Sequence, residues 1–179
     1  MSEPAASLFS HRIGVETLRP RPSEIVVVPT EAERAAIVAA LDLASLERLE
    51  GRYRLSRESD RVTLEGRLVA NLEQRCVVSL EPVPLKVNEP INLVFAPQAE
   101  DEAEDAEPKL AEIDLDYDAG DPPEPIVNGG IDLGAVTLEF LALALDPYPR
   151  KPGVEWTGPE DDPAENSPFA ALARLKRGE

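Results

Sequence analysis

Cys76 and His11 are the only cysteine and the only histidine of the chain, so few side chains can act as a nucleophile or an imidazole base. A reactive thiol needs a neighbouring base or a positive field that lowers its pKa. Arg75 is adjacent in sequence, but neighbouring residues of a strand point to opposite faces. We therefore interpret Cys76 as a structural thiol and His11 as a surface side chain near the start of a strand.

Other motifs that carry chemistry are also missing from the sequence. It contains neither the G-x-S-x-G turn of a serine hydrolase nor a phosphate-binding Walker loop. Asp114, Asp116 and Asp118 alternate, but they lack the central glycine and distal glutamate of a calcium-binding EF-hand. We expect no catalytic site and no cofactor, so the protein is predicted to act by binding.

A group of arginines is the main basic feature, and it consists of Arg48, Arg52, Arg54, Arg57 and Arg61. Guanidinium groups suit bidentate contacts with phosphate. Arg48, Arg52 and Arg54 share one parity of a predicted strand and would form a stripe on one face. Glutamates at positions 47, 50 and 58 interleave with the arginines and can neutralise them. Two interpretations stay open: an ion-paired, solvated sheet face, or a stripe that binds RNA phosphates.

Acidic residues dominate the second half of the chain. The chain has 18 Lys and Arg against 35 Asp and Glu, a formal net charge of −17. Residues 1–97 contribute −2 of this charge and residues 98–179 contribute −15. The densest run, QAEDEAEDAEP, starts at position 98, and we predict a flexible acidic loop over 98–109. Such a loop either keeps the protein soluble or attracts a basic partner, and it repels nucleic acid.

The sequence contains no apolar run near the roughly 20 residues that a membrane-spanning helix requires. The longest candidate, 133–145, is interrupted by Thr137 and Glu139. Residues 1–10 lack the basic and apolar regions of a secretion signal, and a single cysteine suits a reducing compartment. We expect a cytoplasmic protein without a membrane contact.

The hydrophobic pattern predicts a single α+β domain over residues 1–146. Alternating residues predict strands at 11–19, 25–28, 48–57, 62–72, 83–87 and 91–95, a further alternating segment at 110–117 and a short edge strand at 125–127. Thr30 and Glu33 form the capping box of a helix that fades near Asp42, and Asp132 is predicted to cap a second helix that ends before Pro147. Together these elements predict an antiparallel meander sheet of about five to seven strands, open or barrel-like, packed by one or two helices.

The C-terminal part is predicted to form an arm outside this domain. Residues 147–165 are rich in proline and acidic residues, which is typical of a disordered linker. The motif at 166–179 places Pro168, Phe169, Leu172 and Leu175 before basic residues, with the spacing of a short one-sided helix. These four residues are candidates for binding a partner in a groove, and the alternative is that the segment folds back onto its own domain.

Three segments, taken in their order along the chain, resemble a known family. They are CVVSLEPV at 76–83, NGGIDLG at 128–134 with the helix end LALDPYP at 143–149, and SPFAALARLK at 167–176. This order resembles the YceD family, the bacterial large ribosomal RNA subunit accumulation proteins. The matching motif residues are Cys76, Leu80, Glu81, Pro82, Val83, Ile131, Asp132 and Leu133. The resemblance extends from the strand after Arg61 to the end of the chain.

The resemblance implies a non-enzymatic factor needed for the accumulation or processing of 23S ribosomal RNA. Many members carry a C-x-x-C pair in the first motif and further cysteines after the late helix, a pattern like that of a zinc site. Here Ser79 stands at the second position of the pair, and no cysteine follows Leu145. One thiolate cannot hold tetrahedral zinc, so we expect a metal-free turn that is held by packing around Val77, Leu80 and Val83.

The charge pattern, combined with the resemblance, favours a protein contact over an RNA clamp. We expect the direct partner to be a basic ribosomal protein or an assembly factor of the large subunit. The alternative is direct contact with ribosomal RNA through the arginine stripe.

Overall fold

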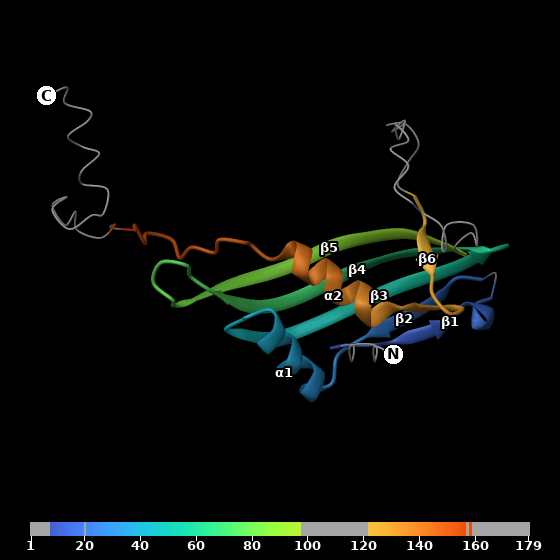
Figure 1. Cartoon of the computed structure of the whole chain (residues 1–179), viewed down its shortest axis with the longest axis horizontal. Helices are drawn as coiled ribbons and strands as arrows, with labels where there is room; N and C mark the ends of the chain where they lie inside the picture. Colours follow the sequence, from blue (N-terminus) through green and yellow to red (C-terminus); the bar gives the residue numbers. More distant parts are fainter. Residues whose placement is uncertain (1–7, 20, 98–121, 157, 159–179) are drawn as a thin grey trace, which may run out of the picture.

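The computed structural model describes residues 8–19, 21–97, 122–156 and 158 of the chain (Figure 1). The elements are β1 (Arg12–Gly14), the 3-10 turn η1 (Val15–Thr17), β2 (Ser23–Val27), α1 (Glu31–Ala40), β3 (Ser45–Glu58), β4 (Arg61–Arg75), β5 (Pro82–Pro97), β6 (Glu124–Ile126), β7 (Gly130–Asp132) and α2 (Leu133–Ala144). The expected α+β class is confirmed.

The main sheet has the order β2-β3-β4-β5-β6. The first four strands are antiparallel neighbours, as the meander prediction requires. β6 is the exception, because it pairs in parallel with the end of β5. β2 and β6 lie at opposite edges, so the described sheet is open and does not close into the barrel that the sequence left as an option.

One face of the sheet is covered by α2, which lies along it in Figure 1. The side chains in this layer are apolar because β3, β4 and β5 alternate between buried and solvent-facing positions. The most buried members of the core include Ile37, Leu55, Leu64, Leu68, Ile91, Leu133 and Leu141. Because α1 and α2 contribute to this same core, the sheet has one covered face and one face without a helix.

Tyr53 connects the middle of the sheet to α2. Its ring is buried, and its hydroxyl lies 2.7 Å from the Thr137 hydroxyl, which donates to the Leu133 carbonyl. Gly51 and Gly66 make room for the ring, because a Cβ atom on either glycine would lie 2.6 Å from a ring carbon of Tyr53. Burial raises the pKa of the Tyr53 hydroxyl. The Tyr53 side chain therefore points inward, toward α2.

The two predicted helix starts are confirmed in detail. The Thr30 side chain accepts from the Glu33 amide while the Glu33 carboxylate accepts from the Thr30 amide, which is a complete capping box. The Asp132 carboxylate accepts from the amides of Gly134 and Ala135 at the start of α2. It also accepts from the His11 amide, so this cap fixes β1 against β7.

Two strand predictions were wrong. The strand predicted over 11–19 ends at Gly14, because the Val15 amide donates to the Gly129 carbonyl and the chain turns into η1. The strands predicted at 83–87 and 91–95 are one continuous strand, β5, which passes through Pro90. Among the described residues, most of β5 has no neighbour on its second side, and an edge strand tolerates proline where the missing amide would face solvent. The alternating segment at 110–117 lies outside the described residues.

Candidate functional site

The face of the sheet opposite α2 carries the predicted arginine stripe. Arg48, Arg52 and Arg54 lie at alternate positions of β3, between buried residues that point toward the helices. Their side chains are 49%, 65% and 57% exposed. The predicted common face of these three arginines is therefore confirmed.

Carboxylates on the same face hold these three arginines. Arg48 and Arg52 both donate to the carboxylate of Glu50, which lies between them on β3. Arg54 donates to Glu24 on the neighbouring strand β2 at 2.9 Å. The hydrogen bonds from Arg48 and Arg52 lower the pKa of the Glu50 carboxyl, and the hydrogen bond to Glu24 raises the pKa of Arg54. The stripe is thus largely an ion-paired surface.

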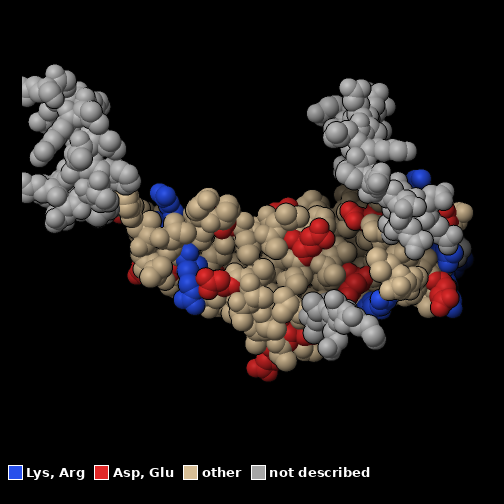
Figure 2. Space-filling view, viewed as in Figure 1, with Lys and Arg blue, Asp and Glu red and all other residues tan. Residues whose placement is uncertain are grey.

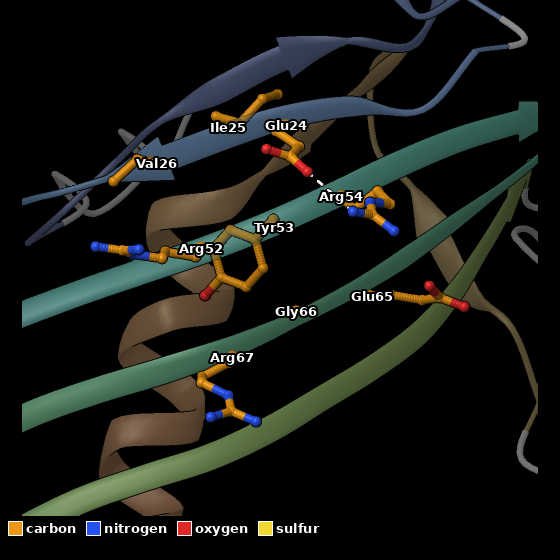
Figure 3. A pocket seen from close by; sticks show the side chains of 9 residues that line it. All are labelled: Glu24, Ile25, Val26, Arg52, Tyr53, Arg54, Glu65, Gly66 and Arg67. Atoms are coloured by element: carbon orange, nitrogen blue, oxygen red, sulfur yellow. Dashed lines mark hydrogen bonds and ion pairs between the residues drawn. The ribbon is translucent and has the colours of Figure 1, made fainter.

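Arg67 joins the stripe from the next strand. It is the direct cross-strand partner of Arg52, and it is exposed. Within the described part of the chain, no carboxylate forms an ion pair with it. Figure 3 shows Arg52, Arg54 and Arg67 around an open hollow of about 480 Å³, with α2 behind the sheet. The floor of the hollow is the backbone at Tyr53 and Gly66, whose side-chain positions face inward.

Of the other two predicted arginines, Arg61 has the parity of Arg67 on β4 and lies at the hairpin end of the same face, whereas Arg57 does not lie on this face. Arg57 has the opposite parity, and its guanidinium donates to the carbonyls of Val15 and Ser59. It therefore holds η1 and the β3–β4 turn instead of facing the solvated sheet surface. Arg61 lies at the end of the hairpin, opposite Glu58.

The turn between β4 and β5 is built around the Cys76 sulfur. Cys76 is fully buried, and its Sγ accepts from the backbone amides of Val78 at 3.5 Å and Ser79 at 3.4 Å. A third amide, that of Lys151, donates to the same sulfur at 3.4 Å. Leu80 completes the turn with a φ of 60°. One sulfur atom thus joins two segments that are 75 residues apart.

Two further contacts fasten residues 149–154 to this turn. The Val77 amide donates to the Pro149 carbonyl at 2.9 Å, and Lys151 Nζ lies 2.8 Å from the Glu81 carboxylate. Hydrogen bonds from Ser79 and from the Lys151 amide lower the pKa of the Cys76 thiol to about 6. We call this cluster, Cys76, Ser79, Glu81 and Lys151, the thiolate clip. The expectation that packing around Val77, Leu80 and Val83 holds this turn was wrong, because Val77 and Leu80 are 47% and 72% exposed. Hydrogen bonds to the Cys76 sulfur hold the turn instead.

A zinc ion does not fit the donors around the clip. Cys76 offers the single thiolate, and Ser79 stands where a second one would be needed. In residues 8–19, 21–97, 122–156 and 158, no group of three or more His, Cys, Asp or Glu side chains is placed to hold a metal. Tetrahedral zinc sites take four strong ligands, or three with a water.

The remaining motif residues have structural positions. Pro82 and Val83 begin β5, and Ile131 and Leu133 are buried on either side of the Asp132 cap. The partner-binding candidates Pro168, Phe169, Leu172 and Leu175, and the acidic loop at 98–109, lie outside the described residues.

Sequence reasoning missed the role of Lys151. Its contacts with Cys76 and Glu81 join distant parts of the chain, and no local sequence pattern predicts such contacts. The pairing of Arg67 with Arg52 was also not predicted. The signal for that pair is the register of the β3–β4 hairpin, which its turn at Ser59 and Asp60 sets.

A match to a protein-family model identifies the family of this chain. The family model of the large ribosomal RNA subunit accumulation protein YceD matches residues 64–176, which is more than half of the chain. The chain belongs to the YceD family. Membership implies a role for this YceD protein in the accumulation of large-subunit ribosomal RNA. No curated protein and no solved structure gives a significant match. No helix among the described residues of this YceD protein is long and apolar enough to cross a membrane.

Proposed function

We propose that this YceD protein supports the accumulation of large-subunit ribosomal RNA without catalysis, by binding a basic ribosomal protein or assembly factor. The observation that carries the proposal is the distribution of charge. The chain has a net charge of −17, yet the described residues contain 14 Lys and Arg against 18 Asp and Glu, a net of −4. An acidic protein attracts cationic partners and repels polyphosphate.

The helix side of the body offers a surface for such a partner. Figure 2 shows this face, with carboxylates spread over its middle and Lys and Arg gathered toward its two ends. Glu139 is exposed on α2. Glu89 is exposed on β5 between the buried Val87 and Ile91, so it belongs to the same face. A basic segment of a partner that lies along α2 would contact these carboxylates. In Figure 2, the described Lys and Arg residues lie away from the middle of this face and would not repel such a segment there.

The ion pairs of the opposite face argue against an RNA clamp as the main activity. Arg48, Arg52 and Arg54 already contact Glu50 or Glu24. Phosphate binding at these arginines would have to displace carboxylates and overcome the negative charge of the whole chain. Among the described residues of β3 and β4, no aromatic side chain is available on this face for base stacking, since Tyr53 points toward α2.

Direct binding of ribosomal RNA is the second candidate, and the pair Arg52 and Arg67 favours it. Both guanidinium groups border the hollow of Figure 3, and Arg67 has no ion-pair partner among the described residues. Exposed ion pairs contribute about 0–1 kcal/mol, so a phosphate can compete for Arg52 at low salt.

Affinity capture with the full-length tagged chain, with and without ribonuclease, tests the proposal. We expect basic large-subunit proteins to remain bound after ribonuclease treatment. The double variant Glu89→Gln, Glu139→Gln removes two negative charges from the helix side and should weaken this capture. Loss of all ribosomal components after ribonuclease, or equal capture by the variant, would contradict the proposal.

A further inference from the structure

A shallow groove of about 370 Å³ lies where α1, β4 and α2 end. Its apolar lining comes from Leu41 after α1, from Val77 after β4, and from Ala142 and Leu145 at the end of α2. Val77 is 47% exposed, and Ala142 is exposed on the last turn of α2. Apolar side chains from three elements therefore converge on a surface that the described residues leave open.

Two carboxylates stand at the rim of this groove. Asp42 follows α1 and its side chain is 91% exposed, with Arg75 as a distant partner at 3.7 Å. Asp146 follows α2 and is also exposed. Arg75 also lines the groove, so two carboxylates and one guanidinium border its apolar floor. The net negative charge suits a segment that combines apolar anchors with basic side chains.

We propose that the C-terminal segment 166–179 of the same chain occupies this groove in the free protein. Phe169 and Leu172 would contact the apolar lining, and the basic residues Arg174, Lys176 and Arg177 would lie near Asp42 and Asp146. The segment has one apolar cluster followed by basic residues, which is the complement of the groove.

The path of the chain supports an intramolecular occupant. Residues 149–154 are fastened beside the groove by the thiolate clip, and Pro149 itself lines the groove. Trp156 lies next to Val77, with which it borders a second hollow. Twelve residues lie between Trp156 and Phe169, and such a chain reaches up to about 40 Å when extended. A tether of this length gives the segment an effective concentration in the millimolar range.

Hydrogen exchange of the full-length protein, followed by mass spectrometry, tests this inference. Ala142→Arg places a bulky cation in the groove, and Leu143→Arg is the matched control because Leu143 is exposed on the adjacent position and does not line the groove. We expect peptides from 166–179 to exchange about tenfold faster in Ala142→Arg than in the wild type and in Leu143→Arg, which corresponds to a contact of about 0.1 mM affinity at a millimolar effective concentration. Phe169→Ala should increase exchange in peptides that contain Leu41 and Leu145, whereas Ala171→Ser should not.

Each result decides for or against the inference. Equal exchange of the 166–179 peptides in the wild type and Ala142→Arg would overturn it, and so would no response of the groove to Phe169→Ala. Protection that rises with protein concentration would assign the groove to the segment of a second copy and overturn the intramolecular contact. Protection that appears only after a large-subunit protein is added would assign the groove to that partner. The first comparison needs no partner, so its outcome is separate from that of the proposed function.

Discussion

Arg52 on β3 and Arg67 on β4 are direct cross-strand partners on the face of the sheet that no helix covers. Like charges opposite each other destabilise a sheet. Glu50 compensates Arg52 but not Arg67. Among the described residues, Arg67 is therefore a cation of the sheet whose charge no ion pair balances.

We predict that Arg67→Gln stabilises the protein. The substitution removes the repulsion between two guanidinium groups and keeps most of the aliphatic stem, so the free energy of unfolding should rise by about 0.2–1 kcal/mol. Urea unfolding at low salt measures this change, and the gain should shrink at high salt. Arg54→Gln is the control, because it breaks the ion pair with Glu24 and should not stabilise. A loss of stability in Arg67→Gln would show that the side chain is needed for the fold.

Any affinity of this YceD protein for ribosomal RNA should be confined to low salt. Replacing both Arg52 and Arg67 with Gln removes two phosphate contacts, which should reduce the slope of log affinity against log salt by about 1.4–1.8. Filter binding at several salt concentrations measures the slope. Arg34→Gln on α1 is the control and should leave the slope unchanged. An unchanged slope in the double variant would exclude the hollow as the RNA contact.

Gly66→Ala should destabilise the fold. A Cβ atom at this position would clash with the Arg52 carbonyl oxygen and would lie 2.6 Å from the Tyr53 ring, which is fixed between the sheet and Thr137. Overpacking of this kind costs about 1–3 kcal/mol of the free energy of unfolding. Gly14→Ala is the matched control, because its nearest side-chain atom would be 3.7 Å away. Equal stability of the two variants in chemical denaturation would mean that the ring does not rest on Gly66.

These elements differ in how far the sequence alone could predict them. The capping box at Thr30 and the cap at Asp132 are local, so sequence spacing was enough to predict them. The opposite parity of Arg57 is also visible in the sequence, because 57 is odd whereas 48, 52 and 54 are even. The continuity of β5 through Pro90 was not predictable in this way, since it depends on β5 being an edge strand. The thiolate clip requires residues 76 and 151 to meet, which depends on the tertiary fold.

The thiolate clip should make stability depend on pH. Hydrogen bonds to the sulfur hold the pKa of the Cys76 thiol at about 6 in the folded protein, well below the ordinary range of a thiol. For an acid whose pKa is lowered by folding, the contribution to stability is complete above the unfolded pKa and is lost as pH falls through the folded pKa. The free energy of unfolding should therefore rise between pH 6 and pH 9. Urea unfolding at several pH values measures this, and Cys76→Ala should remove the rise. An equal rise in the variant would assign it to other groups.

Binding measured with purified components tests the central claim most directly. The full-length protein is titrated at about 0.15 M salt, where exposed charges more than about 8 Å apart are largely screened, against proteins extracted from large ribosomal subunits and, separately, against naked large-subunit ribosomal RNA. We predict binding to one or more basic proteins and no measurable binding to the RNA. Firm binding to the naked RNA with no binding to the protein fraction would contradict the account.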